Sequence, residues 1–136
     1  MKRLMILLGT ILLLTVGAFA DSSVTVDNAA FNFGKTTQRA KMVHTFWVKA
    51  VGQKPVRVTR VIPGCGCTKM PLPDSVITPG DSLPLTIIFD SKSFRGNIVK
   101  KPYFKTDSDD EPHFVTIYAE ALVHPNEAEP LVIDPP

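Results

Sequence analysis

The strongest strand pattern in the chain is MVHTFWVKAV, residues 42–51. Successive side chains of a strand point to opposite faces, so Phe46 and Val48 share one face while Trp47 lies on the other. A turn containing Gly and Pro follows, and it leads into a second pattern, VRVTRVI, at residues 56–62. Period-two alternation of this kind indicates strands that pack one face on a core.

The same alternation recurs on both sides of this segment. Further strands are expected at residues 23–28, 31–33, 83–89, 97–106 and 114–123. Gly34 is expected to end the second of these seven patterns, and Thr78-Pro79-Gly80-Asp81 has Pro and Gly where a type II turn requires them. About seven short strands in roughly 100 residues predict an all-β fold, an antiparallel immunoglobulin-like β-sandwich. Trp47 is a candidate core residue of that sandwich.

The first twenty residues have the three parts of a secretory signal peptide. Lys2 and Arg3 precede an apolar run at residues 4–16, and Ala18-Phe19-Ala20 is a small-x-small cleavage site. The alternative is an uncleaved anchor, but the apolar run is short beside the ~20 residues of a spanning helix. We expect a signal peptide at 1–20, a sandwich domain at 21–123 and a Pro-rich acidic tail at 124–136.

Cleavage after Ala20 changes the charge balance of the protein. It removes Lys2 and Arg3, so 13 basic and 13 acidic residues remain and the net charge is zero. Nucleic-acid binding then lacks its electrostatic basis. We expect a periplasmic or extracellular protein that is not stably inserted in the membrane, in a compartment where disulfides are permitted.

The one chemical motif is Pro63-Gly64-Cys65-Gly66-Cys67-Thr68, which follows a strand and precedes a proline-rich loop. Two residues apart on an extended strand, the cysteine Cα atoms would lie about 6.6 Å apart, at the long limit for a disulfide. Gly66 is expected to shorten that span by adopting a dihedral closed to other residues. A three-residue loop yields only about 1.6 kcal/mol of stabilisation, so such a bridge would be reducible and functional rather than structural.

Two other interpretations of the motif remain open. Thiolates of Cys65 and Cys67, with the thioether of Met70 close by in sequence, would suit Cu(I) better than a hard cation. Alternatively, the two cysteines are small buried side chains at a tight turn. Gly64, Gly66 and Thr68 would support the motif in each case. His44 shares a strand face with Phe46, which favours a histidine at the core over a metal ligand.

These segments resemble the bacterial family called domain of unknown function 1573. The resemblance rests on the order and spacing of short motifs across residues 29–123. They are Phe31-Asn32-Phe33-Gly34-Lys35, His44-Thr45-Phe46, Pro55-Val56-Arg57-Val58, Cys65-Gly66-Cys67-Thr68, Ile77-Thr78-Pro79-Gly80-Asp81-Ser82, Phe89-Asp90-Ser91-Lys92 and Gly96. The chain departs from the family at Ala50-Val51-Gly52 and Thr106-Asp107-Ser108-Asp109, both in turns. The resemblance implies an immunoglobulin-like sandwich, similar to major sperm protein and Hydin-type modules, in an exported protein. It implies no activity.

Two functions are consistent with the sequence. No nucleophile elbow, phosphate loop or zinc helix is present, so no catalytic residue is assigned. We therefore expect a non-enzymatic module that binds or organises an envelope protein, without a cofactor. The alternative is thiol redox exchange or Cu(I) binding at Cys65 and Cys67.

Overall fold

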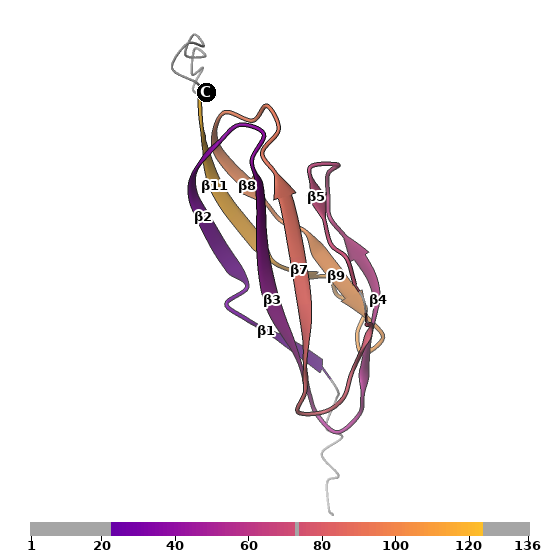
Figure 1. The fold of residues 1–136 in the computed structure, drawn as a ribbon. Helices are drawn as coiled ribbons and strands as arrows, with labels where there is room; N and C mark the ends of the chain where they lie inside the picture. Colours follow the sequence, from indigo (N-terminus) through magenta and orange to yellow (C-terminus); the bar gives the residue numbers. More distant parts are fainter. Residues whose placement is uncertain (1–22, 73, 124–136) are drawn as a thin grey trace, which may run out of the picture.

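The computed structural model describes residues 23–72 and 74–123. The predicted signal peptide and tail lie outside these residues. The described part of the chain is all-β, with strands β1 to β11. It contains no helix of the length and apolarity that a membrane crossing requires. The fold-class prediction is confirmed, because the strands form two facing layers in which the pairing is antiparallel with one exception (Figure 1).

The first layer is a sheet in the order β1-β3-β7-β5. Its strands are β1 (Ser23–Asp27), β3 (Lys41–Val51), β7 (Ser82–Asp90) and β5 (Thr68–Lys69). The centre of the sheet is the β3/β7 pair, whose register runs from Lys41 opposite Asp90 to Lys49 opposite Ser82. Strand β5 reaches only Phe89 and Ile88, so Pro84 lies where β7 has no partner on that side. Proline has no N–H to donate, and it is tolerated there because no neighbouring strand requires one.

The second layer is built from two groups of strands. One group is β2 (Ala30–Thr37), β11 (Thr116–Leu122) and β8 (Gly96–Lys100). The other is β10 (His113–Phe114), β9 (Tyr103–Thr106), β4 (Val56–Ile62) and β6 (Val76–Ile77). Strand β8 continues into β9 after a break at buried Pro102, where proline has no N–H to donate to a neighbouring strand.

Strands β2 and β11 run parallel, which is the exception to the antiparallel pairing. The expectation that Gly34 ends a strand is wrong, since β2 continues to Thr37. Gly34 has a φ of +73°, and the register shifts between Tyr118 and Glu120. A glycine in this conformation allows a β-bulge, and the strand resumes beyond it. The N–H of Gly34 donates to Oδ1 of Asn32 at 2.8 Å, which holds the bulge in place.

The core lies between the two layers. Its largest fully buried side chains include Phe46 and Phe89 from the first layer and Phe104 and Ile117 from the second. Trp47 is not a core residue, contrary to expectation, because its side chain is 50% exposed. It occupies the opposite face of β3 from Phe46, and that face points to solvent.

The turn prediction at residues 78–81 is confirmed. The N–H of Asp81 donates to the carbonyl oxygen of Thr78 at 2.9 Å, and Gly80 has a φ of +84°. The short strands β5 and β6 were not predicted. With two residues each, they carry no readable alternation.

Candidate functional site

The candidate site is the Cys65–Cys67 disulfide, in the turn between β4 and β5. The Cα atoms of the two cysteines are 5.2 Å apart. That is shorter than the spacing on an extended strand, because residues 64–67 form a bend and turn. The glycine that takes the left-handed conformation is Gly64, with a φ of +82°, and not Gly66 as expected.

The two sulfur atoms lie in different surroundings. Cys67 is 6% exposed and Cys65 is only partly buried against the core. The hydroxyl of Thr68, a residue 3% exposed, lies 3.4 Å from Sγ of Cys65 and 3.7 Å from Sγ of Cys67. Neither sulfur of a disulfide carries a hydrogen atom, so the hydroxyl is the donor, and its single hydrogen is shared between the two sulfurs.

Backbone hydrogen bonds attach this turn to the first layer. The N–H of Asp90 donates to the carbonyl oxygen of Cys67 at 2.8 Å, and Thr68 pairs with Phe89. The ammonium group of Lys92 donates to the carbonyl oxygen of Gly66 at 3.2 Å. A positive charge therefore lies beside the carbonyl group of Gly66, the residue between the two cysteines.

Lys92 is positioned by a network of loop contacts at the same end of the sandwich. Its N–H donates to Oδ1 of Asp90 at 2.9 Å, and its carbonyl oxygen accepts from the N–H of Arg39 at 2.7 Å. The preceding residue, Ser91, is fully buried. Its hydroxyl donates to the carbonyl oxygen of Thr37 at 2.8 Å and accepts from the N–H of Ala40 at 2.9 Å. The loop after β7 and the loop after β2 are thus joined beside the disulfide.

The other candidate metal ligands are Met70 and the histidines. Within residues 23–72 and 74–123, no three His, Cys, Asp or Glu side chains are arranged to hold a metal ion. Met70 is buried at 6% exposure, and Cu(I) binding by the cysteines would first require reduction of the bridge. His44 stacks on Phe31 with ring centroids 3.6 Å apart, and burial lowers the pKa of its imidazole. His113 contacts Asp109 at 3.0 Å.

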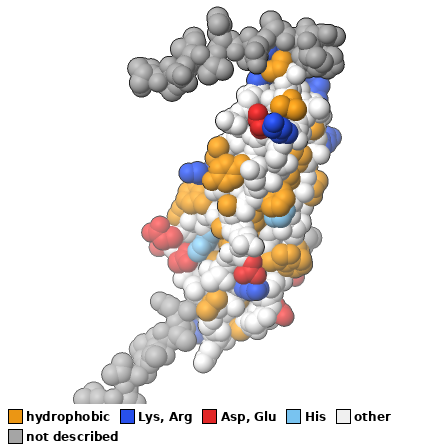
Figure 2. All heavy atoms as spheres, turned by 90° about the vertical axis from the view of Figure 1, so that its left-hand side faces the viewer, with side chains coloured by type: hydrophobic (Ala, Val, Ile, Leu, Met, Phe, Trp, Pro, Cys, Tyr) orange, Lys and Arg blue, Asp and Glu red, His pale blue; other side chains and the backbone are white. Residues whose placement is uncertain are grey.

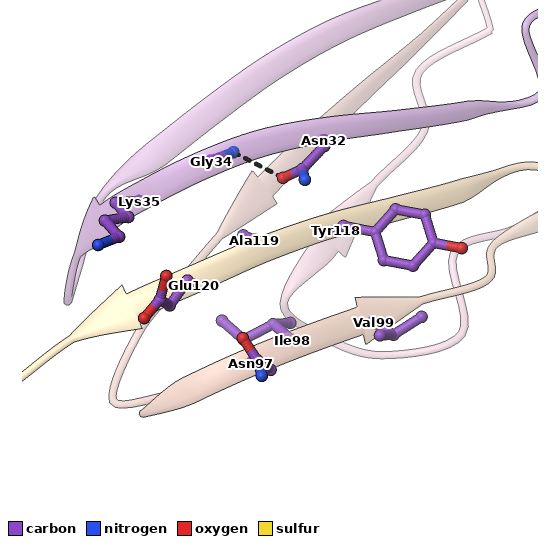
Figure 3. Close-up of a pocket in the computed structure, with 9 residues that line it drawn as sticks. All are labelled: Asn32, Gly34, Lys35, Asn97, Ile98, Val99, Tyr118, Ala119 and Glu120. Atoms are coloured by element: carbon purple, nitrogen blue, oxygen red, sulfur yellow. Dashed lines mark hydrogen bonds between the residues drawn. The ribbon is translucent and has the colours of Figure 1, made fainter.

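A concave feature away from the cysteines was not predicted. A shallow groove of about 520 Å³ crosses the outer face of β2, β11 and β8 at the β-bulge. Figure 3 shows Tyr118 and Glu120 along its central strand, with Lys35 on one side and Asn97 on the other. The glycine at position 34 is the sequence feature that could have indicated the groove, since glycine permits a β-bulge and bulges redirect neighbouring side chains. Figure 2 shows hydrophobic patches along one side of the molecule with acidic and basic groups interspersed among them.

Solved structures share the fold at low sequence identity. A protein of unknown function from Porphyromonas gingivalis W83 matches with a TM-score of 0.63 at 15% identity, covering 78% of this chain and 51% of that one. The PapD-like domain 7 of human CEP192 matches with a TM-score of 0.55 at 12% identity, covering 81% of this chain and 89% of that one. The Vibrio cholerae VesB protease matches with a TM-score of 0.55 at 13% identity, covering 71% of this chain and 31% of that one.

These likenesses establish the fold and no activity. This chain spans about half the length of the Porphyromonas gingivalis protein and about a third of the protease. No curated protein matches the sequence. A family model for proteins of unknown function, DUF1573, matches residues 24–121, which is most of the chain. The resemblance inferred from the short motifs is thereby confirmed, and the chain belongs to the DUF1573 family.

Proposed function

We propose that this protein is an exported, non-enzymatic β-sandwich module that binds another protein of the cell envelope, in the periplasm or outside the cell. The observation that carries the proposal is the exposure of Trp47 in the middle of the outer face of the β1-β3-β7-β5 sheet. Export is supported by the signal-peptide pattern of residues 1–20.

The outer face around Trp47 carries a stripe along β3 and β7 in which two apolar pairs are separated by Thr45 and Thr86, whose hydroxyls hydrogen-bond to each other at 3.0 Å. Val43 lies opposite Ile88, and Trp47 lies opposite Pro84. Val43 is 60% exposed and Trp47 is 50% exposed. Tryptophan is enriched among the residues that dominate protein–protein binding energy, whereas charged residues are depleted at interface centres. The occupant we propose is an envelope protein that presents an apolar side chain to this stripe.

Site-specific photo-crosslinking tests this proposal. A benzophenone side chain is placed at position 47 and, as a control of equal exposure on the other layer, at position 99; Val99 is 51% exposed. We expect one envelope protein to crosslink from position 47 and not from position 99. The purified partner should then bind Trp47→Ala at least tenfold more weakly than wild type, and bind Val99→Ala normally. Equal binding to Trp47→Ala and wild type would refute the proposal.

A second candidate function is favoured by the observed bridge. Cys65 and Cys67 are bonded across one residue, Cys65 is partly exposed, and the ammonium group of Lys92 donates to the carbonyl oxygen of Gly66 in the same turn. These features support thiol–disulfide exchange, with Cu(I) binding by the reduced thiols as the metal-dependent variant. Measuring the reduction potential, and titrating the reduced protein with Cu(I), tests both. A potential below about −300 mV together with no copper binding would exclude this function.

A further inference from the structure

We propose that the Cys65–Cys67 bridge exchanges with a dithiol protein in a fixed order, in which Cys65 is attacked and Cys67 departs. Thr68 and Lys92 act as positioning residues that stabilise the departing thiolate. This inference rests on the thiol–disulfide function proposed above, and it adds the order of bond breaking and the groups that control it.

Accessibility selects Cys65 as the sulfur that is attacked. An incoming thiolate approaches along the extension of the S–S bond, so the attacked sulfur must be reachable from solvent. Cys65 is partly exposed, whereas Cys67 is 6% exposed. A protein thiol can therefore reach Sγ of Cys65 with less disturbance of the core.

A hydrogen-bond donor and a cation lie close to the thiolate that forms on Cys67. The Thr68 hydroxyl is 3.4 Å from Sγ of Cys65 and 3.7 Å from Sγ of Cys67, so its position alone favours neither sulfur. Once Cys65 is held in the mixed disulfide, Cys67 carries the negative charge, and the buried hydroxyl can donate to it with little competition from water. The Lys92 ammonium group, 3.2 Å from the carbonyl oxygen of Gly66, adds a positive charge beside the same turn. A nearby cation and a hydrogen-bond donor lower the pKa of a thiol, and a thiol of lower pKa leaves faster.

The exchange is balanced as follows. A thiolate of the partner attacks Sγ of Cys65, a new S–S bond forms, the Cys65–Cys67 bond breaks, and its electron pair leaves on Sγ of Cys67. The second thiolate of the partner then attacks the partner's own sulfur in the mixed disulfide and releases Cys65 as a thiolate. The partner dithiol is oxidised to a disulfide, the Cys65–Cys67 pair gains two electrons, and the two protons lost by the partner thiols are taken up by Cys65 and Cys67 or by water.

Trapping the mixed disulfide tests the order. The oxidised exported protein is mixed with reduced glutathione at pH 7, quenched with excess N-ethylmaleimide after short times, and mapped by tandem mass spectrometry. We expect glutathione on Cys65 and maleimide on Cys67 in most singly modified molecules. Glutathione on Cys67, or an equal distribution, would overturn the proposed order while leaving thiol exchange intact. No reaction with glutathione would remove the thiol function itself.

Equilibration in glutathione redox buffers tests the positioning residues. Thr68→Val and Lys92→Gln should each shift the equilibrium towards the disulfide by three- to tenfold, where tenfold corresponds to about 30 mV. Each should also raise the apparent thiol pKa in the pH profile of alkylation. Lys101→Gln removes the same charge from an exposed site and should change the equilibrium less than twofold. Because Lys92 is exposed, its variant tests the proposal even if Thr68→Val fails to fold; an unchanged equilibrium in Lys92→Gln would refute the role of that cation.

Discussion

Replacing Ser91 by alanine should weaken the whole sandwich, although the change removes a single oxygen atom. Ser91 is fully buried, and its hydroxyl links the carbonyl oxygen of Thr37 at 2.8 Å to the N–H of Ala40 at 2.9 Å. The carbonyl oxygen of Thr37 has one further donor, the hydroxyl of Thr36 at 3.3 Å. Ser91→Ala therefore leaves a backbone acceptor and a backbone donor without this partner in a partly buried setting.

The expected loss follows from these two contacts. A buried polar backbone group that loses its partner costs about 1–3 kcal/mol, and the partial access of water at Ala40 lowers that cost. We therefore expect Ser91→Ala to reduce the free energy of unfolding by about 2–3 kcal/mol. With a urea dependence near 1.5 kcal/mol per M, the midpoint of unfolding should fall by about 1.5 M.

Urea unfolding followed by tryptophan fluorescence measures this loss. Ser93→Ala is the matched control, because Ser93 lies two residues further along the same loop and is exposed. The control should change stability by less than about 0.5 kcal/mol, as is usual for surface substitutions. If the two variants unfold at the same urea concentration, the hydroxyl of Ser91 does not hold the loops together.

Three further predictions concern the core, a titratable group and the bulge. Phe46→Ala should lower the free energy of unfolding by about 3–5 kcal/mol, because Phe46 is 1% exposed. Trp47→Ala should lower it by at least 2 kcal/mol less, because Trp47 is 50% exposed. Denaturant unfolding measures both losses, and equal losses would contradict the assignment of faces on β3. Burial lowers the pKa of His44, so the unfolded chain binds a proton at this imidazole more readily than the folded chain does. The free energy of unfolding should therefore fall as pH drops below about 6.5, with a slope of at most about 1.4 kcal/mol per pH unit. His44→Phe should remove that part of the pH dependence in unfolding between pH 7 and 5, and an unaltered profile would show that another group is responsible. Gly34→Ala should cost about 1 kcal/mol in thermal or urea unfolding through backbone strain alone, since φ is +73° and an added Cβ meets nothing within 4 Å; no loss would argue against the left-handed bulge.

Alternation in the sequence was sufficient to predict the sandwich. The limits of that prediction are instructive at Trp47 and Gly34. The alternation correctly placed Trp47 and Phe46 on opposite faces of one strand, yet Trp47 was still considered for the core because it is large and aromatic. A sandwich buries only one face of each sheet. Since Phe46 is on the buried face, Trp47 had to be exposed. A glycine such as Gly34 is compatible with either the end of a strand or a β-bulge within it. Pairing of the following residues with β11 selects the bulge.

The candidate site was predictable only as a pair of residues. The sequence identified Cys65 and Cys67. The separation of their Cα atoms depends on the turn that contains them, and the shape of that turn could not be predicted because its residues show no hydrophobic alternation. The contact with Lys92 is 26 residues away in sequence, so it arises from the pairing of β5 with β7 and not from any local motif. Thr68 was expected to support the motif, and in the structure its hydroxyl lies within hydrogen-bonding distance of both sulfur atoms.

The chemistry proposed for this protein depends on the bridge between Cys65 and Cys67, and the mass of the exported protein tests for that bridge most directly. The protein is denatured and alkylated with and without prior reduction, and its intact mass is measured by mass spectrometry. We predict no label before reduction and two labels after it, on a chain that begins at Asp21. Two labels without reduction would show that the thiols are free in the exported protein, and would contradict the account.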